Sequence, residues 1–247
     1  MPLVAAAICP NPPMIVPEVA GAAADELDDL RTACAEAIGR LLATEPDTVL
    51  VLGPGARTVR YGEADHGSLR PYGLDRTVAL GPAGDPAGRP DLPLSLLVGA
   101  WLLHRAGAPG RRGGQSIAPD ASVDECRRIG GDLVEGPDDR VALLVMGDGS
   151  ACRGERSPGY DDPDAEPYDD AVAAALGKAD GAALLGLDPE LSARLRVAGR
   201  TPWQALAGAV DRTGLSWQGD LSYYAAPYGV SYFVANWMPV GSDRVPA

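Results

Sequence analysis

The chain opens with LVAAAICPNPPMIVPEVAGAAADELDDLRTACAEAIGRLLATEPDTVLVLG (residues 3–53), in which two short apolar runs flank a long amphipathic segment. Residues 3–9 and 48–53 are rich in apolar side chains without alternation, which is typical of strands buried on both faces of a sheet. Residues 22–44 place apolar side chains three and four positions apart, with acidic residues early and Arg40 late, and this pattern predicts an amphipathic helix. Strand, helix and strand in this order predict a crossover between two parallel strands.

The same alternation continues to the end of the chain. The further elements that we expect are strands at residues 77–80, 115–118, 140–147, 217–224 and 228–237, and helices at residues 94–106, at 122–135 and from about Pro167, Pro189 and Pro202 onwards. This pattern favours one α/β domain over residues 1–247, with a largely parallel central sheet flanked by helices and a C-terminal hairpin or mixed edge. The strands at 3–9, 48–53 and 140–147 should be neighbours, so that the loops after them meet at one edge.

The composition excludes several classes of protein. Lys and Arg number 21 against 34 Asp and Glu, giving a formal net charge of −13, so no clustered basic surface is available for nucleic acid. The four cysteines form no CxxC pair and the chain has only 2 histidines, which argues against a zinc finger. No stretch is long and apolar enough to span a membrane, and the first residues lack a basic leader. We therefore expect a cytoplasmic protein with reduced thiols and no membrane partner.

Polar residues gather in the loops that follow the predicted strands. Ligands in open α/β sheets bind beyond the carboxyl ends of the strands, so these loops are where a cleft is expected. The candidate ligand-binding residues are Asn11 and Pro12 after the first strand, Gly55 and Arg57 after the second, Asp65 in a long polar loop, and Asp148 and Ser150 after the strand at 140–147. His66, beside Asp65, is the candidate catalytic acid or base.

Several of these residues admit other interpretations. The glycines at Gly53 and Gly55 could cradle an anion with help from Arg57, although a tight turn explains them more simply. Ser150 loosely resembles a nucleophile elbow, and Cys152 is a possible thiol nucleophile, but neither has an evident activating base in the sequence. The acidic run at 161–166 is better explained as a solvated loop than as a calcium site, and the aromatic C-terminal strands as packing residues rather than as a ligand wall or a subunit interface.

The order and spacing of these loops resemble the catalytic subunits of class III extradiol ring-cleavage dioxygenases and their relatives, which include the Memo-like proteins. The similarity runs over most of the chain. The matching residues are Asn11-Pro12-Pro13 for a His-Pro-Pro-like turn, Gly53-Pro54-Gly55 for a Ser-Pro-His-like turn, Asp65-His66-Gly67 for an Asp-His-Gly triplet, and Gly147-Asp148-Gly149-Ser150-Ala151 for a Gly-Asp-x-Ser-His-like strand end.

This resemblance implies a specific expectation about the site. Active members of the family hold Fe(II) with two histidines and one carboxylate. The positions of the two histidine ligands fall here on Asn11 and near Gly55 or Ala56, and that of an acid/base histidine falls on Ala151, so only the Asp-His-Gly histidine is kept, as His66. His104, near the end of a predicted helix, is better explained as a structural residue.

We therefore expect a dioxygenase-like protein that has lost its iron ligands, holds no metal or other cofactor and binds a small molecule, aromatic compounds among them, or a protein partner. The alternatives are an active oxidoreductase with rearranged ligands around Fe(II), a metal-free enzyme that uses His66, or a non-catalytic subunit of an oligomer. Homo- and hetero-oligomers both stay open. Because His66 lies in a Gly-rich loop with few apolar neighbours, its truncation is expected to leave stability nearly unchanged.

Overall fold

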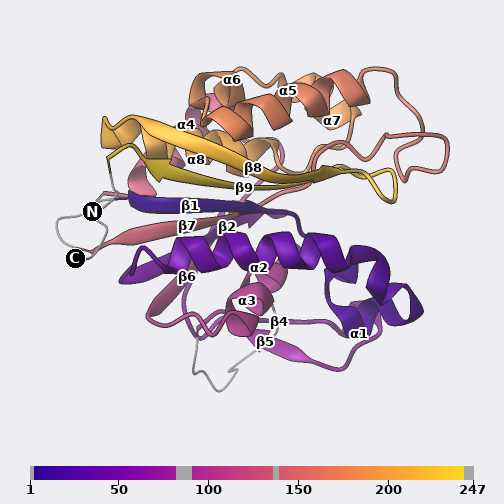
Figure 1. Ribbon diagram of the computed structural model, residues 1–247, viewed down its shortest axis with the longest axis horizontal. Coiled ribbons are helices and arrows are strands. Elements are labelled where there is room, and N and C mark those ends of the chain that lie inside the picture. The colour runs from indigo at the N-terminus through magenta and orange to yellow at the C-terminus, as the bar shows by residue number, and fades with distance from the viewer. Residues whose placement is uncertain (1–2, 82–90, 136–138, 242–247) are drawn as a thin grey trace.

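The computed structural model describes residues 3–81, 91–135 and 139–241, which form an α/β fold around a central sheet with helices on both faces (Figure 1). The sheet has the strand order β3-β6-β2-β7-β1-β9-β8. Its strands are β1 (Leu3–Cys9), β2 (Thr48–Pro54), β3 (Val59–Tyr61), β6 (Arg111–Ile117), β7 (Val141–Met146), β8 (Trp217–Ala225) and β9 (Tyr232–Pro239). A separate two-stranded sheet pairs β4 (His66–Ser68) with β5 (Thr77–Ala79).

The expected neighbours are confirmed. β7 lies between β1 and β2 and pairs with both in parallel, and β2 pairs in parallel with β6. The expectation of a largely parallel sheet is not confirmed, because β3 joins one edge antiparallel and the β8–β9 hairpin joins the other edge antiparallel to β1. The sheet is therefore mixed: its four central strands are parallel and its outer strands are not.

Helices cover the two faces of the sheet in separate groups (Figure 1). One face carries α4 (Val123–Leu133), α5 (Ala165–Lys178), α6 (Gly181–Leu185), α7 (Pro189–Arg194) and α8 (Arg200–Thr213). The other carries α1 (Pro17–Ala20), α2 (Asp28–Leu42), α3 (Leu94–Arg105) and the small β4–β5 sheet. Each face has its own apolar core, and every residue of β7 is buried because this strand is covered on both sides.

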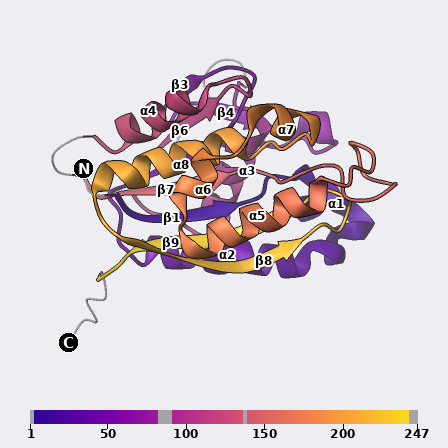
Figure 2. The same ribbon diagram turned by 90° about the horizontal axis from the view of Figure 1, so that it is seen from above.

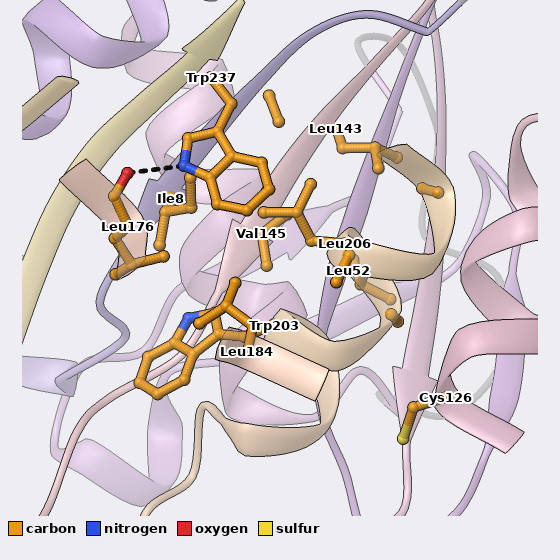
Figure 3. Close-up of a cluster of buried hydrophobic side chains, with 14 of the residues drawn as sticks. Ile8, Leu52, Cys126, Leu143, Val145, Leu176, Leu184, Trp203, Leu206 and Trp237 are labelled. Carbon is orange, nitrogen blue, oxygen red and sulfur yellow. Dashed lines mark hydrogen bonds between the residues drawn. The ribbon is translucent and has the colours of Figure 1, made fainter. Parts of the chain in front are cut away.

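The core on the α8 face is built around two tryptophans (Figure 3). Trp203 of α8 packs edge-on against Phe233, with ring centroids 5.7 Å apart. Trp237 of β9 is equally buried, and its indole N–H donates to the Leu176 carbonyl of α5 at 2.7 Å. Ile8 and Val145 fill the space between them from the sheet (Figure 3). This core fixes α5 and α8 against the central strands.

Most helix boundaries follow from the sequence. The Ser122 hydroxyl accepts the Glu125 N–H and caps α4, and the Asp188 carboxylate accepts the Leu191 N–H and caps α7. The helix expected at residues 22–44 is shorter, because residues 21–27 form 3-10 turns before α2 begins. Two further 3-10 turns cover residues 13–15 and 70–72. Within the described residues, no helix has both the length and the apolar composition needed to cross a bilayer.

Candidate functional site

A pocket of about 410 Å³ opens at the carboxyl ends of β1 and β2, where a ligand site is expected in a sheet of this kind. Figure 2 shows α7 at this end of the molecule, the same end as α1, which follows β1. The residues that line the pocket come from the loops after β1, β2 and β6, the start of α3, and the segment running through α7 into α8: Asn11, Pro54, Gly55, Ala56, Pro93, Leu94, Ser95, Pro119, Pro189, Ser192, Ala193, Val197, Ala198, Arg200 and Thr201. Most of these side chains are apolar.

Two polar side chains of the lining are buried without a hydrogen-bond partner in the described part of the chain. Asn11 is 6% exposed, and its Oδ1 has no hydrogen-bond partner. Thr201 is 2% exposed, and its Oγ1 also has no hydrogen-bond partner. The two serines of the lining differ, because Ser95 donates to the Pro54 carbonyl at 2.6 Å and Ser192 donates to the Asp188 carbonyl at 2.6 Å. Buried polar atoms are normally paired, so Asn11 and Thr201 are the lining residues with hydrogen-bonding capacity left for a ligand.

Arg200, at the first position of α8, is the only arginine or lysine among the lining residues named above. It is 4% exposed, and its guanidinium donates to the Gln204 Oε1 at 2.9 Å and to the carbonyls of Pro119 and Ala121 at 2.5 and 3.1 Å. All three acceptors are neutral. Arg200 could not be identified from the sequence, because an arginine at the start of a helix carries no signal of a ligand site until the helix is placed in space.

Asp148 connects two of the segments that line the pocket. Its Oδ1 accepts the backbone N–H of Asn11 at 2.8 Å, and its backbone carbonyl accepts the N–H of Gly199 at 2.8 Å. The residue therefore ties the loop after β7 both to the loop after β1 and to the start of α8. Loss of hydration raises the pKa of the Asp148 carboxyl to about 7, and the hydrogen bond from Asn11 opposes this shift only in part.

The structure brings some of the sequence candidates together and separates others. Asn11 and Gly55 line the same pocket, and Asp148 contacts Asn11. Pro12 is buried next to Asn11, where its carbonyl accepts the Ile15 N–H at 3.0 Å. Arg57 is exposed and outside the lining, and Asp65 is an exposed residue whose Oδ2 accepts the Gly62 N–H.

The expectation for His66 needs correction. The residue lies in β4 rather than in an open loop, and only 5% of its surface is exposed. It pairs with Ala79 of β5, and its carbonyl accepts the N–H groups of Asp91 and Leu92, the residues that lead into α3. His66 is buried because β4 and β5 pair in an antiparallel sheet that lies against α3. His66 is not among the pocket-lining residues.

Ser150 is also placed away from the pocket. It is completely buried, and both its N–H and its hydroxyl donate to the Asp169 carboxylate, at 2.9 and 2.5 Å. Asp169 of α5 also accepts the Ser231 hydroxyl at 2.5 Å, and the Arg153 guanidinium lies 3.6 Å away. This network joins α5, the loop after β7 and the residue before β9, so Ser150 serves the fold and lacks the access that a nucleophile needs.

The residues of the pocket do not fit the iron site of the resembling family. Of the two positions that would hold histidine ligands, Asn11 offers one amide oxygen and Gly55 has no side chain. No carboxylate, imidazole or thiol belongs to the lining named above. Across the described ranges, no three His, Cys, Asp or Glu side chains are arranged to hold a metal ion. A two-histidine, one-carboxylate set for Fe(II) cannot be assembled from these donors.

Comparisons with known proteins show the fold. Neither a family model nor a curated protein matches the sequence. Among solved structures, the crystal structure of the uncharacterized protein JW3007 from Escherichia coli K12 is similar, with a TM-score of 0.60 and 13% sequence identity. The similarity covers 95% of this chain and 99% of that chain. At this level of identity the two proteins share an architecture, and function has to be argued from the site.

Proposed function

We propose that this protein is a class III extradiol dioxygenase-like protein that binds a small molecule in the pocket at the carboxyl ends of β1 and β2, without a metal centre of the family's kind. The observation that carries the proposal is the pocket itself, which Asn11 and Gly55 line together with the start of α8. These are the two positions at which the resemblance places iron ligands. Their place in the lining supports a binding site at the same position in the fold, with other donors.

The size and lining of the pocket support a small, mainly apolar ligand. Its volume of about 410 Å³ lies in the range of small-molecule sites, roughly 300–1,000 Å³. Leu94, Val197 and several prolines supply apolar walls, while Asn11 and Thr201 supply unpaired oxygens. A compound with one aromatic or alicyclic ring and few polar groups matches this combination of apolar walls and sparse polar contacts.

A thermal-shift screen of catechols, hydroxybenzoates, benzoate and alicyclic analogues tests the proposal. A ligand at a hundred times its Kd stabilises the folded protein by about 2.7 kcal/mol, which such a screen detects. Ala193→Trp, at an exposed position of α7 that lines the pocket, should abolish the response by filling the site. Ala174→Trp, at an exposed position of α5 outside the lining, is the matched control and should keep it. A response unaffected by Ala193→Trp, or no response to any compound, would contradict the proposal.

A further inference from the structure

We propose that the ligand of this pocket is a monocarboxylate, and that Arg200 and the first turn of α8 receive its carboxylate group. The inference rests on the proposed function, since it specifies the chemistry of a ligand for the same pocket. It starts from an imbalance of charge. Arg200 is almost fully buried, and no carboxylate of the described residues lies within ion-pair distance of it.

A buried cation without an anion is unfavourable, because neutral acceptors replace only part of the hydration that the charge has lost. Arg112 is equally buried, and burial lowers the pKa of its guanidinium. The nearby Glu63 carboxylate, which accepts the backbone N–H of Arg112 at 2.9 Å, opposes this shift only in part. The acceptors of the Arg200 guanidinium are all neutral: two carbonyls and the Gln204 amide. A bound anion would supply the missing charge.

The backbone around Arg200 also favours a bound anion. α8 is a 14-residue helix whose N-cap is Gly199, so no side chain caps its first turn, and that turn contains no acidic residue. The N–H groups of Arg200 and Thr201 have no acceptor in the described part of the chain. Helix N-termini with free N–H groups attract anions. Thr201 adds a buried hydroxyl without a partner at the same place.

The single positive charge selects the kind of anion. One guanidinium is a planar donor that matches a carboxylate, whereas a phosphate dianion usually requires more than one cation or a glycine-rich loop. The remaining walls are largely apolar, including Leu94 and Val197. An aromatic or alicyclic monocarboxylate satisfies both halves of the pocket, with its carboxylate at α8 and its ring against the apolar side chains.

The test compares each acid with its neutral isostere. Benzoate and benzamide, 4-hydroxybenzoate and 4-hydroxybenzamide, and cyclohexanecarboxylate and its amide are titrated into the protein at pH 8. Binding is followed by ligand-observed NMR. We expect at least one acid to bind about tenfold or more tightly than its amide, the effect of a hydrogen bond to a charged group. In Arg200→Gln this preference should fall to near one, and Arg200→Lys should keep part of it.

A second variant keeps the test decisive if Arg200→Gln does not fold. Thr201→Val removes a hydroxyl that has no protein partner, so it should fold normally and reduce the preference for the acid severalfold. If Arg200 is only structural, its variants will lower the Tm while the acid-to-amide ratio stays unchanged, and the inference is then wrong. Acid and amide binding equally, both blocked by Ala193→Trp, would overturn the inference and leave the proposed function standing. Binding of neither would overturn the proposed function.

Discussion

At the scale of single residues, two glycines determine where Arg200 and Thr201, the polar wall of the pocket, lie. A Cβ on Gly147 would stand 2.6 Å from the Gly199 Cα, and a Cβ on Gly199 would stand 2.1 Å from the Trp203 ring. The end of β7 and the start of α8 can touch only because neither residue has a side chain. This contact sets the first turn of α8, with Arg200 and Thr201, at the edge of the sheet.

The buried carboxyl of Asp148 makes stability depend on pH. Its folded-state pKa of about 7 exceeds the usual value of 3.8, so between these values the folded protein holds a proton that the unfolded chain releases. Stability therefore falls as the pH rises from about 4 to 7 and stays lower above that range. We expect Asp148→Asn, which keeps an oxygen for the Asn11 N–H, to be more stable than the wild type at pH 8 by about 2–3 kcal/mol.

Urea unfolding at pH 4, pH 6 and pH 8 measures this effect. The difference between Asp148→Asn and the wild type should be largest at pH 8 and should shrink toward zero at pH 4. Parallel pH profiles for the two proteins would mean that Asp148 is ionised in the folded state with an ordinary pKa.

The buried position of His66 changes what its truncation should do. His66→Ala removes a buried side chain of β4, and we expect it to destabilise the protein by about 1–3 kcal/mol, as for other buried side chains of moderate size. His104→Ala is the control: His104 is exposed and its Nε2 hydrogen-bonds the carbonyl of Ala79, the residue that pairs with His66, so its loss should cost less than about 1 kcal/mol. Equal midpoints for His66→Ala and the wild type in urea would show that the imidazole contributes little to the fold.

At the scale of elements, α4 and α8 pack with unusually close backbones. A Cβ on Gly130 of α4 would lie 1.8 Å from the Ala205 carbonyl oxygen of α8, and a Cβ on Gly208 of α8 would lie 2.2 Å from the Arg127 carbonyl oxygen of α4. Each helix thus has a glycine where the other helix passes. This contact fixes α8, whose first residues Arg200 and Thr201 line the pocket, against α4.

Gly130→Ala tests this contact. The added methyl would clash with backbone atoms that cannot move independently, so we expect a loss of about 3 kcal/mol or more, measured by urea or thermal unfolding. Gly131→Ala on the same helix is the matched control, because its nearest neighbour is the Arg212 side chain at 4.0 Å; it should gain about 0.5–1 kcal/mol from helix propensity. A similar change in both variants would show that α4 and α8 can separate without cost.

Sequence patterns predicted the buried elements well because burial on two faces leaves a clear apolar run, as in β1 and β7. The pattern does not give strand direction. β9 is as apolar as a central parallel strand, because it lies between β1 and β8 and is covered on both faces; its antiparallel pairing with β8 agrees with the C-terminal hairpin or mixed edge predicted from the short connection between the two strands. The short strands β3 and β4 were missed because three residues cannot show a period.

At the scale of the whole molecule, sequence patterns located some residues of the site and missed others. Asn11 and Gly55 could be placed at one edge because the ends of parallel strands meet there whatever the details of the fold. Arg200 and Thr201 could not, because they reach the pocket only when α7 and the start of α8 fold back over the sheet. Ser150 follows a strand, as the sequence predicts, but its side chain is buried against Asp169 and is not among the lining residues of the pocket.

Metal content is the property of the whole protein that separates the binding proposal from an oxidoreductase with rearranged ligands. The lining of the pocket offers an amide oxygen and hydroxyl groups, a weak donor set for Fe, Mn or Zn. Protein expressed with iron supplementation and purified anaerobically should therefore carry far less than one equivalent of these metals by elemental analysis. Its response to benzoate in a thermal-shift assay should be the same before and after dialysis against a chelator. Stoichiometric metal that survives desalting and disappears in Asn11→Ala, while the matched Ala174→Trp protein keeps it, would instead place a metal centre in the pocket and make the oxidoreductase the better explanation.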